Sequence, residues 1–188
     1  WFHLGTLLYD RDAHADAANS TWGVLASHGT PMRRLIESGA IDGRNFVQVG
    51  LRGYWPTAET LAWMREQGMR WHLMTEIESR GAEAVVADAI AEALDGPDVV
   101  YLSVDIDVLD PGMAPGTGTP EPGGLLTREL LRAIRQVVGA DVLAGTARVH
   151  QSDQHGYLRS FLLSSDRNSR RRFASFRNAP RITLLVII

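Results

Sequence analysis

The sequence of 188 residues contains no cysteine. Disulfides, thiolate metal sites and cysteine nucleophiles are therefore excluded, and the composition fits a reducing compartment, so we expect a cytoplasmic protein. No apolar run approaches the ~20 residues that a membrane-spanning helix needs, so we expect no membrane partner. Basic side chains are not in excess: the sequence has 19 Lys and Arg and 22 Asp and Glu, which gives a net charge of -3. We accordingly expect no nucleic-acid partner.

The rest of the composition is that of an ordinary globular domain, with 45% hydrophobic and 22% charged residues. Apolar stretches of strand length alternate with helical patterns along the chain. This order predicts an α/β fold in which a parallel sheet is covered by helices on both faces. We expect strands at residues 4–9, 46–50, 71–74 and 99–104, and helices at 32–39, 57–67, 82–94 and 127–138.

Two aspartates, Asp105 and Asp107, follow the apolar run at residues 99–104. In an extended strand, residues i and i+2 project from the same face, so the two carboxylates are expected to converge. Like charges held so close repel each other unless a cation neutralises them, and buried carboxylates without a partner are costly. No basic residue lies nearby in the sequence. The pair therefore predicts a metal site.

A second acidic segment, Asp12-Ala13-His14-Ala15-Asp16, offers oxygen, nitrogen and oxygen donors on one alternating face. Taken alone, it could equally be a polar turn. It follows the expected strand at residues 4–9, and α/β proteins bind ligands beyond the carboxyl ends of parallel strands. Oxygen and imidazole donors without a thiolate favour a divalent ion such as manganese, followed by magnesium, zinc or iron.

Five motifs occur along the chain at residues 12–16 (DAHAD), 27–31 (SHGTP), 74–76 (MTE), 103–111 (SVDIDVLDP) and 116–120 (GTGTP) with Gly123 and Gly124. In this order they resemble the motifs of the ureohydrolases, which are the arginase, agmatinase and guanidino-acid hydrolase enzymes. The resemblance covers about residues 4–145 and looks closest to the agmatinase and guanidinobutyrase branch, because of residues 50–53 (GLRG) and 117–124. It implies a three-layer α/β/α fold with a mainly parallel sheet, incomplete at both ends of this chain. We also expect a homo-oligomer that acts on a small guanidino substrate.

The resemblance further implies two Mn²⁺ ions in each active site. Asp12 and Asp105 would each bridge both ions. A hydroxide held between the two metals would attack the guanidinium carbon of the substrate and release urea. The full set of implied metal ligands is Asp12, His14, Asp16, Asp105 and Asp107, with Asp16 completing one site and His14 and Asp107 serving the other.

Catalytic and substrate-binding roles are implied for three residues. Asp16 would orient the hydroxide and relay a proton to the leaving amine. His28 would shuttle protons near neutral pH, although it could instead be a loop histidine bonded to the backbone. Thr119 would contact the guanidinium, the alternative being that its loop is simply rich in turns. Glu76 and Glu78 could be supporting or solvated acids, and neither is chosen.

Some family motifs have no counterpart in the sequence. The family's first histidine ligand lies upstream of the Asp12 segment; this chain begins at Trp1, without a Met, so we expect a fragment, and His3 does not match that motif. The family's guanidinium-binding Glu would fall at residues 144–149, which read AGTARV. The pattern dissolves from residue 146 onward, which suggests a shifted reading frame or a divergent end. We therefore predict a partial ureohydrolase-like domain at residues 1–145 and a divergent tail at residues 146–188.

Two functional hypotheses follow. The first is an agmatinase- or guanidinobutyrase-like amidinohydrolase that uses manganese to hydrolyse a linear guanidino compound, agmatine or a guanidino acid, to urea and an amine. The second is a catalytically impaired ureohydrolase remnant that acts as a structural or non-catalytic metal-binding subunit. The sequence does not name the substrate. Metal content measured together with urea release distinguishes the two hypotheses.

Overall fold

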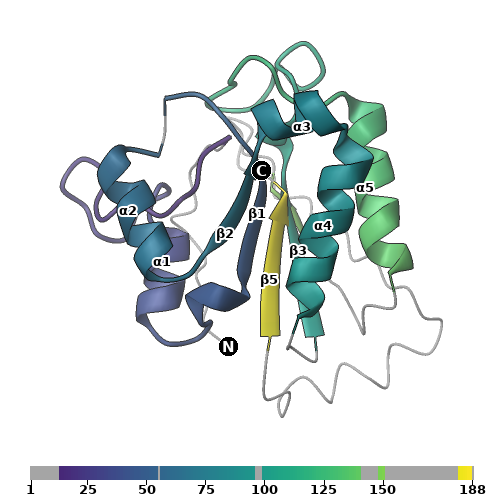
Figure 1. The fold of residues 1–188 in the computed structure, drawn as a ribbon. Helices are drawn as coiled ribbons and strands as arrows, with labels where there is room; N and C mark the ends of the chain where they lie inside the picture. The colour runs from purple at the N-terminus through teal and green to yellow at the C-terminus, as the bar shows by residue number, and fades with distance from the viewer. Residues whose placement is uncertain (1–12, 55, 96–98, 141–147, 151–181, 188) are drawn as a thin grey trace.

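The structure is a computed structural model that describes residues 13–54, 56–95, 99–140, 148–150 and 182–187 (Figure 1). Within these residues, five strands form one sheet in the order β2-β1-β5-β3-β4. All four neighbouring pairs are parallel, as the sequence predicts. The strands are β1 (Phe46–Leu51), β2 (Arg70–Leu73), β3 (Val99–Asp105), β4 (Arg148–His150) and β5 (Ile182–Ile187).

Helices cover both faces of this sheet, which gives the expected three layers (Figure 1). Val47 and Val49 of β1 pack into a core cluster with α4 and α5. Phe46 and Leu51 of the same strand belong to a second cluster with α1 and α2. None of the described helices is long and apolar enough to span a membrane. The helices are α1 (Pro31–Glu37), α2 (Ala58–Glu66), α3 (Met74–Arg80), α4 (Ala82–Leu94) and α5 (Thr127–Gly139).

The predicted helices are confirmed to within a few residues. Helix α4 has the predicted bounds because its alanine-rich sequence has high helix propensity and regularly spaced apolar residues. Thr57 caps α2, since its hydroxyl accepts a hydrogen bond of 3.2 Å from the Thr60 N–H. At α5, Thr127 is the first helical residue and does not cap the helix. The carboxylate of Glu129 accepts from the Leu126 N–H at 2.8 Å instead.

Two local predictions are corrected. The strand predicted at residues 71–74 ends at Leu73, and Met74 begins α3, a helix that the sequence pattern did not reveal because Leu73 offers no side-chain cap. Strand β3 ends at Asp105, and a 3₁₀ helix (Ile106–Val108) follows. Asp105 and Asp107 therefore do not share one face of a strand, contrary to the prediction, although both residues lie at the same edge of the sheet.

The C-terminal apolar run, which sequence reasoning did not assign to the fold, forms β5 at the centre of the sheet. This strand pairs with β1 on one side and β3 on the other. It completes the parallel sheet between the two strands whose carboxyl ends carry the candidate site. The strand predicted at residues 4–9 and most of the predicted tail lie outside the described residues.

Candidate metal centre

The segment at residues 13–17 lies along the end of β1, fixed by its backbone. The Arg52 N–H donates to the Ala13 carbonyl at 3.3 Å, and the buried Gln48 side chain donates to the Ala15 carbonyl at 3.0 Å. Ala15 and Ala17 are buried in the second core cluster. Asp16 has a φ of 50°, a left-handed conformation that aspartate tolerates better than most residues. This alternation of small core residues with polar residues brings His14 and Asp16 to a cavity.

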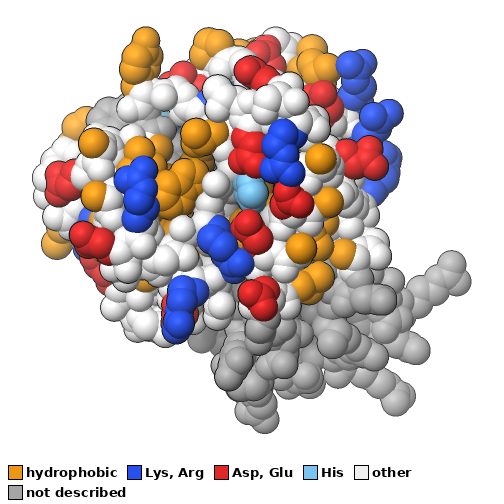
Figure 2. Space-filling model, viewed as in Figure 1, with side chains coloured by type: hydrophobic (Ala, Val, Ile, Leu, Met, Phe, Trp, Pro, Cys, Tyr) orange, Lys and Arg blue, Asp and Glu red, His pale blue; other side chains and the backbone are white. Residues whose placement is uncertain are grey.

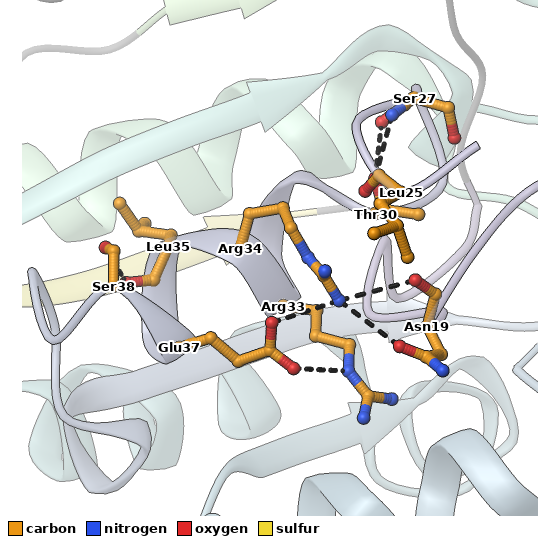
Figure 3. A network of polar contacts seen from close by, with 9 residues as sticks. All are labelled: Asn19, Leu25, Ser27, Thr30, Arg33, Arg34, Leu35, Glu37 and Ser38. Atoms are coloured by element: carbon orange, nitrogen blue, oxygen red, sulfur yellow. Dashed lines mark hydrogen bonds and ion pairs between the residues drawn. The ribbon is translucent and has the colours of Figure 1, made fainter.

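The loop at residues 18–30 is attached to α1 by a network of polar contacts (Figure 3). The buried Thr30 hydroxyl accepts from the Ser27 N–H and contacts the Leu25 and Ser27 carbonyl oxygens, each at 2.9 Å. Arg34 donates to the Asn19 carbonyl at 3.3 Å and pairs with Glu37 at 3.1 Å. The network fixes the loop that carries His28.

Replacing Thr30 with valine should destabilise the protein by about 1–3 kcal/mol, because an isosteric methyl group leaves the Ser27 N–H without its acceptor. The free energy of unfolding, measured by urea denaturation, tests this. A matched control is Thr127→Val, since Thr127 is exposed and should change stability by less than about 0.5 kcal/mol. Equal stability of Thr30→Val and wild type would show that the hydroxyl does not hold the loop.

The second half of the site lies at the end of β3. Asp107 is fully buried, and its N–H donates to the Asp105 carboxylate at 3.1 Å. Burial raises the pKa of the Asp105 carboxyl to about 6, although hydrogen bonds from the Asp107 and Ile106 N–H groups and the nearby His14 act to lower this pKa. The folded chain therefore resists a negative charge on Asp105 unless a cation accompanies it.

This pKa predicts how stability depends on pH when metal is chelated. Asp105 is protonated in the folded chain up to about pH 6, whereas in the unfolded chain it ionises near about pH 4. The folded state thus binds the extra proton, and its contribution to stability is lost as the pH rises from about 4 to 6. Urea denaturation in chelator at both pH values should show this loss in wild type, and Asp105→Asn should reduce it. An identical pH dependence in both proteins would contradict the raised pKa.

A cavity of about 310 Å³ lies between the segment that carries His14 and Asp16, the loop that carries His28, and the loop that carries Thr119; its described lining includes no residue from the end of β3. Two of its polar atoms are buried and form no hydrogen bond with any described residue: the Asp16 Oδ1 and the Thr119 Oγ1. Burial lowers the pKa of His28, whose ring contacts the Trp22 ring edge-on with centroids 5.0 Å apart. The lining residues include His14, Asp16, Trp22, His28, Thr119 and Glu121.

Across the cavity, His14 faces an acid that sequence reasoning missed. Its Nε2 lies 3.6 Å from the Glu121 carboxylate. Burial lowers the pKa of His14, and the attraction of Glu121 and Asp105 only partly offsets this effect. A neutral imidazole is the form that binds metals. Glu121 could have been suspected from its position two residues after Thr119, in a loop rich in glycine and proline.

The structure thus places four of the five predicted metal ligands at the carboxyl edge of the sheet, and the fifth, Asp12, lies outside the described residues. Among the residues described, no three His, Asp or Glu side chains are grouped closely enough to hold an ion by themselves. His28 and Thr119, the remaining predicted site residues, line the cavity with His14 and Asp16.

Glu76 belongs to a different network. Its carboxylate lies 3.0 Å from the Nδ1 of His72 and pairs with Arg80, while the Nε2 of His72 lies 3.4 Å from Glu92. On the face seen in Figure 2, acidic and basic side chains are mixed. Glu76 is absent from the described lining of the cavity, so it connects β2 to α3 rather than contributing to the site.

The parallel sheet covered by helices on both faces makes this chain an α/β protein, and its candidate site lies at the carboxyl edge of the sheet, where such proteins commonly bind ligands. The family model described as the arginase family matches residues 8–147, and the chain belongs to that family. Proclavaminate amidinohydrolase from Streptomyces clavuligerus is 42% identical over 156 residues, which cover 80% of this chain and 48% of that protein. Guanidinobutyrase from Pseudomonas aeruginosa is 42% identical over 132 residues, 70% of this chain and 41% of that protein.

Solved structures agree with this assignment. Formimidoylglutamase from Bacillus subtilis has a TM-score of 0.70 at 32% identity, over 79% of this chain and 46% of that one. The arginase-like fold inferred from the motifs is therefore confirmed. The chain spans less than half of the length of these three proteins.

Proposed function

We propose that this chain forms the metal-binding part of an amidinohydrolase that cleaves a linear guanidino compound to urea and an amine with manganese. The observation that carries the proposal is a cavity at which His14 and Asp16 lie beside His28 and Thr119, with Asp105 close enough to affect the pKa of His14. Its relatives include an amidinohydrolase and a guanidinobutyrase, which supports a guanidino substrate. Agmatine and guanidino acids are the substrates to test first.

The residues present fit a divalent cation. The Asp16 Oδ1 is buried without a hydrogen-bond donor among the described residues, and a cation would satisfy it. Burial raises the pKa of Asp105, so a charged Asp105 requires a nearby cation, and burial lowers the pKa of His14, which leaves the imidazole in the neutral form that binds metals. Oxygen and imidazole donors suit manganese, and the solved formiminoglutamase from Trypanosoma cruzi carries Mn²⁺. We propose Asp12, His14, Asp16, Asp105 and Asp107 as the ligands.

The other cavity residues would bind the substrate and move protons. A guanidinium group has only N–H donors, so the Thr119 oxygen can accept from it, and the carboxylate of Glu121 favours its positive charge. His28, whose pKa is lowered by burial, is neutral near pH 7 and can accept a proton. Asp16 can hold a proton between the reacting water and the leaving amine. Bound manganese would supply Lewis acidity toward the water and the guanidino group.

Urea release tests the catalytic part of this proposal. The full chain, loaded with Mn²⁺, should release urea from agmatine or 4-guanidinobutyrate, and chelator should abolish the release. His28→Asn should lower the rate by about 100-fold or more, because an amide cannot exchange protons near neutral pH. His72→Asn is the control, since His72 lies on β2 outside the lining of the cavity. Metal-loaded protein that releases no urea from any guanidino compound would contradict the proposed activity.

The second candidate is a metal-binding subunit without activity. It is favoured by residues 144–149, which read AGTARV where the family carries its guanidinium-binding Glu. These residues lie largely outside the described part of the chain. Tight Mn²⁺ binding without any urea release would favour this candidate over the enzyme.

A further inference from the structure

The most connected side chain at the site is Arg52, which follows β1. Its Nη2 donates to the backbone carbonyls of Asp107, Leu109 (3.3 Å) and Glu121 (2.9 Å). Its Nε also contacts the carbonyls of Glu121 at 3.2 Å and Pro122 at 3.3 Å. One guanidinium group therefore joins the end of β1 to two segments more than 50 residues away in sequence.

Both segments carry residues of the proposed site. The first, residues 107–110, begins with the buried Asp107 at the end of β3. The second, residues 119–122, contains Thr119 and Glu121, which line the cavity. Arg52 contacts the backbone of both segments, so it can set their separation without touching a substrate.

The two segments also contact each other directly. The Asp110 N–H donates to the Leu125 carbonyl at 3.0 Å, and the Leu125 N–H donates to the Val108 carbonyl at 2.9 Å. The Asp110 carboxylate accepts from the Gly123 N–H at 3.1 Å. These three bonds involve residues 123 and 125, whereas the backbone of Glu121 and Pro122 is contacted by Arg52.

Glu121 is also placed by the turn that follows Arg52. Gly53 has a φ of +77°, and a Cβ there would lie 2.8 Å from the Glu121 Cδ. The Glu121 side chain, which faces His14, therefore packs against the Gly53 backbone, where a larger residue would leave it no room. Arg52 fixes the backbone of Glu121, and Gly53 leaves room for its side chain.

We propose that Arg52 is a positioning residue that couples the metal-ligand end of β3 to the loop that faces the substrate. The inference deepens the proposed function and rests on it for the roles of Asp107 and Thr119. Arginine suits this task because its planar fork presents five N–H donors in fixed directions. Lysine has a single ammonium group and cannot reproduce this planar set of directed donors toward both segments.

Hydrogen exchange followed by mass spectrometry tests the positioning in the full chain. In Arg52→Met, peptides that cover residues 107–112 and 119–126 should exchange about 10-fold faster, while peptides from α4 should be unchanged. Arg52→Lys should give an intermediate effect. The matched control is Arg70→Met, because Arg70 also donates to a carbonyl, that of Arg44 at 2.7 Å, which belongs to neither segment. Unchanged exchange in the two segments, or equal acceleration in α4, would overturn the proposal.

Manganese affinity distinguishes a positioning role of Arg52 from a role in stability alone, because a role in stability alone should leave the affinity of the folded chain unchanged. Arg52→Met should bind Mn²⁺ about 10- to 100-fold more weakly than wild type, and Arg70→Met should bind it equally well. Faster exchange with unchanged affinity would refute the coupling to the metal ligands. If wild type itself binds no Mn²⁺, the proposed function fails, whereas the exchange experiment still decides whether Arg52 holds the two segments.

Discussion

Replacing Asp105 with asparagine should abolish the stabilisation that Mn²⁺ gives to the folded chain. The carboxylate stands at the carboxyl end of β3, and a neutral amide of the same size cannot supply the charge that a cation requires. At a Mn²⁺ concentration about 100-fold above its Kd, wild type should gain about 2.7 kcal/mol in free energy of unfolding. The variant should gain almost nothing. Urea denaturation with metal and with chelator measures both gains.

The variant without metal is the internal reference for this experiment. Since burial raises the pKa of Asp105, the amide should leave the chelated protein at least as stable as wild type near pH 8. Asp95→Asn serves as the matched control, because Asp95 is exposed at the end of α4 and should keep the full gain from Mn²⁺. If Asp105→Asn gained as much stability from Mn²⁺ as wild type does, Asp105 would not be a ligand.

Replacing Gly124 with alanine should destabilise the protein by about 1–3 kcal/mol or more, because a side chain there has no room. A Cβ on Gly124 would lie 2.5 Å from the Asp110 nitrogen and the Leu109 carbonyl carbon, and 2.6 Å from the Val108 oxygen. All three are backbone atoms of the segment that follows β3 and contains Asp107, and they cannot move without displacing that segment. The variant should therefore also lose Mn²⁺ affinity. The free energy of unfolding and a Mn²⁺ titration test these two effects.

Gly139 provides the matched glycine control. It ends α5, and a Cβ there would meet nothing within 4 Å. Gly139→Ala should leave Mn²⁺ binding unchanged and raise stability by up to about 1 kcal/mol, because alanine favours the helix. Equal stability losses in the two variants would mean that the contact between Gly124 and the β3 end is not what requires glycine.

Hydrophobic periodicity predicted the helices and strands whose own sequence has a clear helical or strand pattern. Helix α4 is rich in alanine, and β1 is an apolar run that is buried along its whole length, so local pattern and tertiary context agree. It missed α3 because that helix begins directly after β2 without a capping side chain. It also could not place β5, since the position of a strand within a parallel sheet depends on distant partners rather than on its own sequence.

The sequence predicted those candidate site residues that lie close together in short motifs. The residue types at Asp12 to Asp16 and at Asp105 and Asp107 indicated a cation, and the resemblance assigned them roles. The contacts of Arg52 with distant carbonyls were not predictable, and the loop position that could raise suspicion of Glu121 could not pair it with His14, because both depend on which groups meet across the fold. Strand geometry correctly predicted that Asp105 and Asp107 lie at one edge of the sheet. They do not share a strand face, however, because β3 ends at Asp105.

Electron paramagnetic resonance tests the central claim, that this chain holds manganese at the edge of its sheet, most directly. Free aqueous Mn²⁺ gives a sharp spectrum that disappears when protein ligands bind the ion. When Mn²⁺ is titrated into the wild-type chain, the free-ion signal should stay suppressed until the site is filled. When it is titrated into Asp105→Asn, the signal should grow from the first addition. A free-ion signal that grows in proportion to added Mn²⁺ in wild type, as it does in buffer alone, would contradict the account.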